Sequence, residues 1–280
     1  MSKKNKDQEQ KSSRRRRDRG AEGGGLRRQV DSYGDRSVRV IYVAAEGART
    51  EPDYFELISK TYGNRTGREF QIKLCRPSHS NGLRPEEVVD FVLAGAKAQG
   101  GLDCEKWAFF DRDTKDNRDA EIPSAMRKAH QHGVQVGLSH PSFELWPLLH
   151  FEPFTRQVDG VSDAVLERLR SNRDAKGFEE YDRASGDRGK GLGGQRGQSL
   201  LGREKDAIRN ARKLVTACRH GDCSPKNADL DAIDAKKDES YEDWRKRTGH
   251  AAGCDALQRD PSTDVWRLIA SLDIGTEESQ

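Results

Sequence analysis

The chain has 280 residues, of which 33% are hydrophobic and 35% are charged, and its formal net charge is +3. So low a hydrophobic fraction predicts a core that occupies only part of the length, beside chain that stays exposed or disordered. No apolar run approaches the roughly 20 residues needed to cross a bilayer. No apolar segment follows the basic N-terminus as in a secretory signal, and five unevenly spaced cysteines do not suggest a disulfide framework. We therefore expect a cytoplasmic protein with no membrane segment.

Residues 1–36 hold much of the basic charge, with 12 Lys or Arg against 6 Asp or Glu. This stretch, which includes four consecutive arginines at 14–17, cannot bury enough apolar surface to offset the entropy cost of ordering. We predict a disordered basic tail. It can serve as an arm for phosphate backbones or simply as a solubilising tail, since Arg runs attract nucleic acid without selecting a sequence.

Residues 37–44 form a nearly continuous apolar run, typical of a buried parallel strand. The run leads into Glu46 and Gly47, and a helix is expected to begin at Thr50. Thr50 is a plausible N-cap with Asp53 as its partner three residues later. Gly63 is expected to end this helix.

Strands and helices then alternate along the chain. The expected strands are residues 69–75, 107–110 and 134–138, and the expected helices begin at Pro85 and span residues 123–132. Strands alternating with helices of this length predict an α/β fold with a mostly parallel sheet flanked by helices.

The C-terminal half is expected to be mainly helical. Helices are predicted over residues 142–151, kinked or ended by Pro147, and over 161–169, 199–219 and 263–272. Residues 173–197 are rich in glycine and charge and are expected to form a long mobile loop, and residues 220–240 look irregular. We divide the chain into the tail, a domain over 37–200, and a helical C-terminal region over 201–280 with an insertion around 215–255.

Carboxylates follow two of the predicted strands. Glu46 ends the first, and Asp111 and Asp113 end the strand at 107–110. Ligands of parallel α/β sheets bind beyond the carboxyl ends of the strands. If these strands are neighbours, three carboxylates converge on one rim, and such hard oxygen ligands suit Mg²⁺ or Mn²⁺. The alternative is that residues 111–113 are a polar loop after a strand.

Four motifs in a fixed order resemble those of a known family. GARTEPDYF, FFDRD, HPSFELWPLLHF and the late DPSTDVWRL resemble the RloB-like family of bacterial defence proteins. A strand ending in Glu-Gly, followed some 60 residues later by one ending in Asp-x-Asp, also resembles the Toprim domain found in topoisomerases, primases and nucleases related to the OLD family. The likeness covers roughly residues 37–200 and the last 20, and it departs from the family between about 215 and 255.

The resemblance implies a Toprim-like fold and metal-dependent phosphodiester cleavage in an anti-phage or abortive response, often beside an ATPase encoded nearby. Glu46 resembles the Toprim glutamate, and Asp111 and Asp113 resemble its metal-binding pair. Glu144 lies in the family's FELW helix, where it could bind a second ion or orient water, and His150 could contact phosphate. Capping or core-lining roles remain open for Glu144 and His150.

Basic side chains around these motifs are candidates for contacts with nucleic acid. Arg49 or Arg112 could steady a phosphate, while the glycine-rich loop carries Arg183, Arg188, Lys190 and Arg196 as an adaptable clamp. That loop formally fits G-x-G-x-x-G at 189–194, but no strand precedes it, which argues against a dinucleotide site. A solvated surface loop is the plain alternative.

A zinc site across the insertion is a further, weaker hypothesis. Cys218, Cys223, His250 and Cys254, with His220 nearby, contain enough thiolate and imidazole for a tetrahedral site. Their spacing is irregular for known finger patterns, so free thiols are the default interpretation.

The sequence therefore predicts a Mg²⁺- or Mn²⁺-dependent nuclease that acts on RNA or DNA in defence. The alternative is a non-catalytic subunit that keeps the Toprim fold and docks on a partner ATPase. An intact acidic triad argues against the alternative, because close carboxylates are costly to hold together. A primase- or topoisomerase-type enzyme is a third and weaker possibility, since no further catalytic domain is visible.

Overall fold

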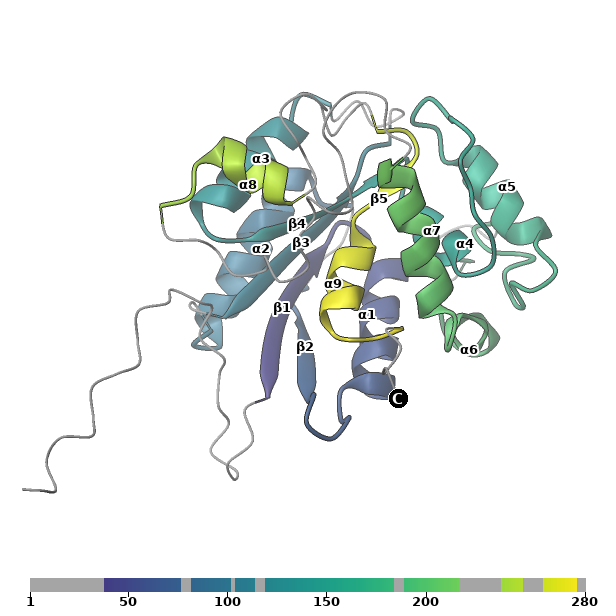
Figure 1. Ribbon diagram of the computed structural model, residues 1–280, viewed down its shortest axis with the longest axis horizontal. Coiled ribbons are helices and arrows are strands. Elements are labelled where there is room, and N and C mark those ends of the chain that lie inside the picture. Colours follow the sequence, from purple (N-terminus) through teal and green to yellow (C-terminus); the bar gives the residue numbers. More distant parts are fainter. Residues whose placement is uncertain are drawn as a thin grey trace, which may run out of the picture.

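The structure is a computed structural model, and it describes residues 38–76, 82–101, 104–113, 119–183, 189–216, 238–248 and 259–275. A twisted sheet runs through the middle with helices on both sides (Figure 1). The predicted basic tail, Arg188 and the possible zinc ligands Cys218, Cys223, His250 and Cys254 lie outside the described residues.

The sheet has five strands in the order β2-β1-β3-β4-β5. The strands are β1 (Arg39–Ala45), β2 (Phe70–Leu74), β3 (Glu105–Asp111), β4 (Gln135–His140) and β5 (Ser262–Thr263). All pairs are parallel except β4 with β5, which is antiparallel. The predicted α/β class with a mostly parallel sheet is confirmed.

Most helices match the predicted alternation with some shifts of their ends, but the helices at 195–200 and 241–247 were not predicted, and the helix expected over 199–219 begins only at Glu204. The helices are α1 (Thr50–Tyr62), α2 (Pro85–Ala98), α3 (Ile122–Gln131), α4 (Leu145–Leu149), α5 (Asp163–Ser171), α6 (Gln195–Leu200), α7 (Glu204–Thr216), α8 (Tyr241–Arg247) and α9 (Val265–Ser271). The stretch expected to be helical over 142–151 forms only the short α4, which contains Pro147.

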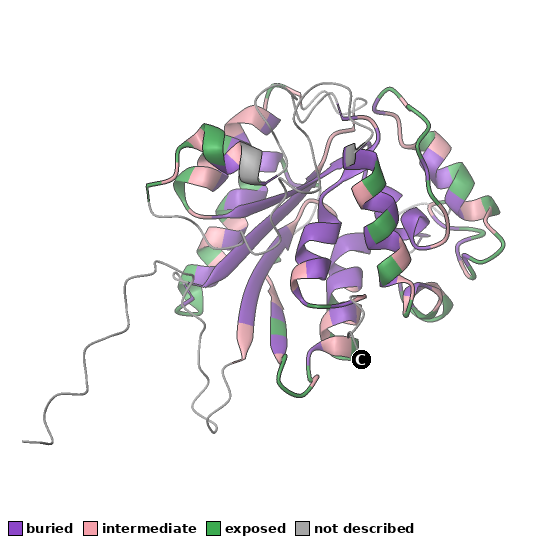
Figure 2. Cartoon of the chain, in the orientation of Figure 1, coloured by how far each residue is buried: buried purple, intermediate pink, exposed green. Residues whose placement is uncertain are grey.

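Each face of the sheet carries its own hydrophobic core, because successive side chains of a strand point to opposite faces. Ile41, Val43, Trp107 and Phe109 pack under α1, α4, α5, α6, α7 and α9. The side chains that alternate with these along β1 and β3 point to the other face of the sheet, and they pack under α2, α3 and α8. Figure 2 shows the central strands β1, β3 and β4 buried almost throughout, whereas the edge strand β2 is partly exposed.

The first of these cores joins early and late parts of the chain. It contains Ile41 of β1 together with Leu214 of α7 and Ile274 near the C-terminus. The described parts of residues 37–200 and 201–280 therefore share one core. Among the described residues, no helix combines the length and the apolar character needed to span a bilayer.

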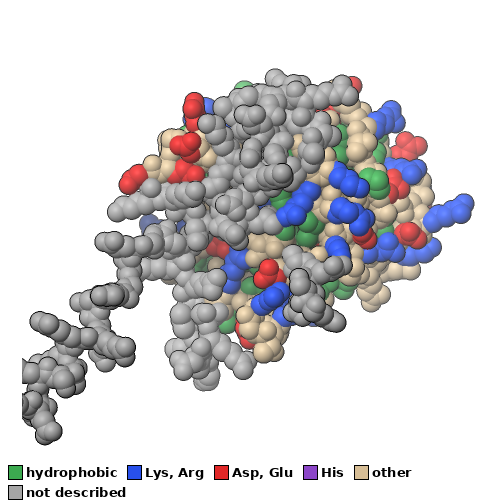
Figure 3. Space-filling model, in the orientation of Figure 1, with side chains coloured by type: hydrophobic (Ala, Val, Ile, Leu, Met, Phe, Trp, Pro, Cys, Tyr) green, Lys and Arg blue, Asp and Glu red, His purple; other side chains and the backbone are tan. Residues whose placement is uncertain are grey.

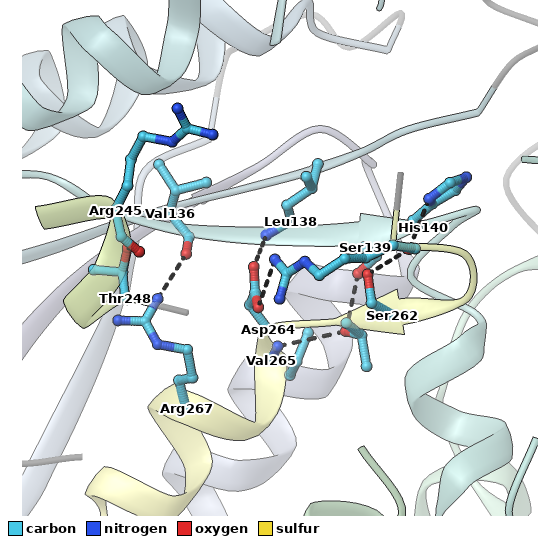
Figure 4. Close-up of polar contacts among 12 residues, drawn as sticks. Val136, Leu138, Ser139, His140, Arg245, Thr248, Ser262, Asp264, Val265 and Arg267 are labelled. Carbon is cyan, nitrogen blue, oxygen red and sulfur yellow. Dashed lines mark hydrogen bonds and ion pairs between the residues drawn. The ribbon is translucent and has the colours of Figure 1, made fainter. Parts of the chain in front are cut away.

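The short strand β5 was not predicted. Ser262 and Thr263 pair with the end of β4, and the Asp264 carboxylate accepts a hydrogen bond from the Leu138 N–H at 3.2 Å (Figure 4). The guanidinium of Arg267 donates to the Val136 carbonyl at 3.3 Å. These contacts fix the start of α9 against β4, so the last helix begins at Val265 and not at Thr263.

The prediction of a mobile loop over residues 173–197 is wrong for the part that the structure describes. Phe178, Tyr181 and Leu192 are buried there. The Arg196 guanidinium donates to the carbonyls of Gly177, Gly189 and Gly191 at 2.6–2.9 Å. Arg196 therefore holds these turns together, and it does not serve as part of a phosphate clamp.

Candidate active site

Glu46 and Asp111 come together at the carboxyl edge of the sheet because their strands are neighbours. The β1–β3 register pairs Ala45 with Phe109, and the Glu46 N–H donates to the Phe109 carbonyl at 2.9 Å. The Glu46 carboxylate in turn accepts a hydrogen bond from the Asp111 N–H at 3.1 Å. Side chains 65 residues apart in the sequence thus form the centre of the candidate site.

Glu144 joins this pair through the turn that follows β4. Asp111 Oδ2 accepts a hydrogen bond from the backbone N–H of Phe143 at 3.0 Å, which fixes the chain just before Glu144. Glu144 is buried, and it accepts a hydrogen bond from the Tyr181 hydroxyl at 2.9 Å. The FELW motif is therefore attached directly to the Asp-x-Asp motif.

Glu51 is a fourth carboxylate, which sequence reasoning missed. It lies in the first turn of α1, is 6% exposed, and accepts a hydrogen bond from the Gly47 N–H at 3.0 Å. The signal was available in the sequence: a helix that starts directly after a strand ending at the ligand edge brings its first turn to that edge.

Neighbouring carboxylates raise the pKa values of Asp111 and Glu51. Burial and the negative charges of Glu46, Glu51 and Glu144 raise the pKa of Asp111 well above its ordinary value. Burial, followed by the charges of Glu144 and Glu46, raises the pKa of Glu51 from 4.5 to about 7. Like charges in low dielectric disfavour ionisation, so a bound cation would relieve a repulsion that is built into the site.

The donor chemistry fits Mg²⁺ or Mn²⁺, because every candidate ligand is a carboxylate oxygen. Within the part of the chain that the structure describes, however, no three His, Cys, Asp or Glu side chains stand ready as a metal-binding group. Glu46, Glu51 and Asp111 instead each accept a backbone N–H. These side chains would have to reorient to bind an ion together.

Asp113 takes a different direction from Asp111. The strand β3 ends at Asp111, and the half-buried Asp113 lies beyond it. Its carboxylate accepts a hydrogen bond from the Ser162 hydroxyl at 3.3 Å. The prediction that Asp113 converges on one rim with Glu46 and Asp111 therefore does not describe this arrangement, because β3 ends at Asp111 and the Asp113 carboxylate is bonded to Ser162.

Lys190 is the cation that faces the acidic cluster. Burial by itself lowers its pKa, but the charges of Glu144, Asp182, Glu51 and Asp111 outweigh that effect and raise it. Its ammonium group lies 3.7 Å from the Asp182 carboxylate, with about half of the side chain exposed. Lys190 is therefore a half-exposed cation within electrostatic reach of the carboxylates.

Two predicted phosphate contacts do not fit the structure. The Arg112 guanidinium makes two hydrogen bonds to Asp119, at 2.9 and 3.0 Å, and lies 2.8 Å from Nε2 of His140. His150 is 1% exposed, its Nδ1 lies 2.9 Å from the Trp146 carbonyl oxygen, and burial lowers its pKa to about 4. Arg112 is held in an ion pair, and a neutral imidazole in the core does not reach substrate.

Arg49 remains available as a phosphate contact. It directly precedes α1, its carbonyl accepts the first hydrogen bond of the helix from the Asp53 N–H at 2.9 Å, and its side chain is exposed. Since Glu46 and Glu51 flank it in sequence, the guanidinium lies on the segment that carries two of the carboxylates.

Thr50 does not cap α1 as predicted. It is the first helical residue, the N-cap position is Arg49, and no side-chain cap is formed. The Thr50 hydroxyl donates instead to the Lys190 carbonyl at 3.0 Å, and Asp53 accepts the Leu192 N–H at 3.0 Å. Both side chains that suggested a capping box therefore attach the chain around Lys190 to α1.

Comparison with protein families places this site in context. A family model described as RloB-like protein matches residues 41–272, a span that contains every carboxylate discussed above. Searches of curated proteins and of solved structures gave no significant match. Because the family match extends over most of the chain, the protein belongs to the RloB-like family.

Proposed function

We propose that this RloB-like protein is a metal-dependent nuclease of the Toprim type. The observation that carries the proposal is the meeting of Glu46 and Asp111 at the carboxyl edge of two neighbouring parallel strands. Glu51 and Glu144 lie in the same electrostatic cluster. Carboxylate clusters at this edge suit divalent cations that act on phosphodiesters.

Glu46, Asp111, Glu51 and Glu144 would hold Mg²⁺ or Mn²⁺, and Asp113 would join them if it turned away from Ser162. When bound, such a cation lowers the pKa of water and stabilises charge that builds on the phosphoryl oxygens. Glu46 would be a ligand or a proton-transfer group. Lys190 and Arg49, which are both accessible, would bind the negatively charged phosphate.

Nucleic acid, either RNA or DNA, is the proposed substrate. Exposed basic side chains recur every four residues along α7, at Lys205, Arg209 and Lys213. Arg209 also pairs with Asp206 one turn earlier, and both of these side chains are exposed, so a phosphate can compete for the guanidinium. Figure 3 shows Lys and Arg side chains gathered over this helix. One helical turn separates successive members by about 6 Å, so the row would follow a phosphate backbone and supply binding without sequence preference.

The basic row on α7 runs in the direction of the carboxylates. Near the start of α7, Glu204 accepts a hydrogen bond from Tyr62 at the far end of α1. The helix then passes α4, where Asn210 donates to the Leu149 carbonyl, and it contacts β5 at the carboxyl edge of β4. Nucleic acid along α7 would therefore extend toward the edge of the sheet that carries the carboxylates.

The wider role follows from the family resemblance. We propose that cleavage serves anti-phage defence or abortive infection, with an ATPase encoded nearby as a partner. A second candidate is a non-catalytic subunit that docks on such an ATPase. The hydrogen bonds from backbone N–H groups to three of the four carboxylates favour it, because they give the cluster a structural role that needs no metal.

Cleavage assays separate the two candidates. Purified protein with Mn²⁺ is incubated with phage DNA, total RNA and transfer RNA, beside the Glu46→Gln and Asp111→Asn variants. The nuclease proposal expects cleavage by the wild type alone, with all three proteins folded. Equal cleavage by wild type and variants would remove these residues from the mechanism.

A further inference from the structure

A buried chain of oxygen atoms lies beside the carboxylates, and the proposed chemistry does not use it. The Tyr181 hydroxyl donates to the Glu144 carboxylate at 2.9 Å. The oxygens of the Tyr181 and Thr50 hydroxyls lie 2.6 Å apart, and the Thr50 hydroxyl is 3.0 Å from the Lys190 carbonyl. The Tyr181 hydrogen goes to Glu144, so the single hydrogen of the Thr50 hydroxyl is shared between the Tyr181 oxygen and the Lys190 carbonyl. Tyr181 thus connects Glu144 to the backbone that carries Lys190.

The Tyr181 ring is held firmly in place. It is fully buried, it packs on Phe178 with ring centroids 5.5 Å apart, and the Arg196 guanidinium lies 5.1 Å from its centroid. The Tyr181 carbonyl accepts a hydrogen bond from Arg170 at 2.6 Å. With the ring and backbone both fixed, the hydroxyl has one direction available to it, toward Glu144 and Thr50.

Glu144, which Tyr181 holds directly, and Lys190, whose backbone it reaches through Thr50, both belong to the electrostatic cluster of the site. Glu144 raises the pKa values of Glu51 and Asp111, and Lys190 interacts with Glu144, Glu51 and Asp111. The negative charges of the neighbouring carboxylates repel the Glu144 carboxylate. A charge-assisted hydrogen bond from a fixed donor opposes that repulsion more strongly than one between neutral groups.

We propose that Tyr181 is a positioning residue for the nuclease site, an inference that rests on the proposed function. Its hydroxyl holds Glu144 in the orientation in which it binds the cation. Through Thr50 it also fixes the Lys190 backbone, so that the ammonium group faces the scissile phosphate. Residues 172–183 and 189–192 are thus part of the site, although they lie far from its strands in the sequence.

The test compares Tyr181→Phe with a matched control, Tyr62→Phe. Tyr62 also donates to a buried glutamate, Glu204, at 2.8 Å, but at the opposite end of α1. Each variant loses one hydrogen bond between a tyrosine and a carboxylate. A purely structural role for Tyr181 would make the two variants behave alike.

Two measurements are made on each protein: the Mn²⁺ concentration at half of the maximal thermal shift, and kcat for cleavage. Tyr181→Phe is expected to raise the Mn²⁺ midpoint and to lower kcat, each about tenfold or more, the loss typical of a hydrogen bond to a charged group. Tyr62→Phe is expected to leave both unchanged. Thr50→Val, which keeps the side-chain shape, should lower kcat while moving the Mn²⁺ midpoint less.

A double-mutant cycle shows whether Tyr181 acts through Glu144. In a Glu144→Ala background, Tyr181→Phe should move the Mn²⁺ midpoint no further, because no carboxylate remains to be held. A normal midpoint and kcat in Tyr181→Phe would overturn the inference while leaving the nuclease proposal intact, as would additive midpoint shifts in the double variant. A wild-type protein with neither a Mn²⁺ shift nor cleavage would overturn both.

Discussion

Replacing Glu51 with Gln removes one charge from the acidic cluster and keeps a side-chain oxygen that can accept the Gly47 N–H. Glu51 is 6% exposed and its carboxylate lies among Glu46, Asp111 and Glu144. Removing the negative charge therefore relieves both the desolvation and the repulsion that raise its pKa. We expect the cation-free variant to be more stable than the wild type at neutral and alkaline pH.

The size and pH range of the effect follow from the pKa of Glu51, which rises from 4.5 to about 7 on folding. Below pH 4.5 the group is protonated in both states and contributes nothing. Between pH 4.5 and 7 the folded state binds more protons than the unfolded state, so the stability of the wild type falls as pH rises. The full difference, reached above pH 7, is about 3 kcal/mol.

The assay is thermal and urea unfolding in EDTA at pH 4.5 and pH 8. The Glu51→Gln variant should match the wild type at pH 4.5 and melt about 6 to 12 °C higher at pH 8 for a domain of this size. Glu56→Gln is the control, because Glu56 lies exposed on the same helix in an ion pair with Arg76. It should change stability little at either pH. A stability gain of Glu51→Gln that does not depend on pH would refute this account of the cluster.

Three further predictions concern the cation, the basic row and the loop. Mn²⁺ at 100 times its Kd should raise the unfolding free energy of the wild type by about 2.7 kcal/mol, and Asp111→Asn should largely lose this gain in thermal melts. Replacing Lys205, Arg209 and Lys213, the basic row on α7, by Gln should weaken the salt dependence of nucleic-acid binding. In anisotropy titrations, the slope of the logarithm of the binding constant against the logarithm of salt concentration should fall by about 2 to 3. Arg196→Lys should speed proteolysis within residues 172–183 and 189–192, since lysine lacks the planar fork that reaches three carbonyls.

Matched controls make these outcomes decisive. For the row, Gln replacements at Lys97, Arg127 and Lys128 remove the same charge from α2 and α3, on the opposite face of the sheet. An equal loss of salt dependence in both triple variants would mean that α7 has no special role. For the loop, an unchanged proteolysis pattern in Arg196→Lys would mean that other contacts hold these turns.

The strands could be predicted because a strand that is buried on both faces is a continuous apolar run in the sequence. The β1 and β3 strands are apolar at nearly every position, as a central parallel strand must be, and both lie where the apolar runs predicted them. The inference that Glu46 and Asp111 meet depended on those strands being neighbours. The β1–β3 pairing confirms that condition.

Features that depend on distant contacts could not be predicted. Thr50 looked like a helix cap, yet its hydroxyl meets Tyr181 and Lys190, which are 131 and 140 residues away. Residues 173–197 lack any helical or strand period in the sequence, but single buried side chains such as Phe178 hold the described parts, 173–183 and 189–197, in place. The two-residue strand β5 has no pattern of its own and forms because β4 offers an edge.

The site shows the same division. Glu46 and Asp111 could be identified because each lies at the end of a predicted strand. The place of Glu51 depends on how α1 packs, and the direction of Asp113 depends on its contact with Ser162. For His150, its place in the family's FELW helix suggested a phosphate contact, and a core-lining role was the alternative. Its imidazole instead packs between aromatic rings in the core, with the Trp146 ring 5.0 Å away.

The most direct test of the central claim is Mn²⁺-dependent cleavage by the wild type, Glu46→Gln and Glu56→Gln, assayed side by side on phage DNA, total RNA and transfer RNA. A metal site built on Glu46 requires that the wild type and Glu56→Gln cleave at least one substrate and that a folded Glu46→Gln cleaves none. Cleavage by Glu46→Gln at the wild-type rate would remove Glu46 from the active site.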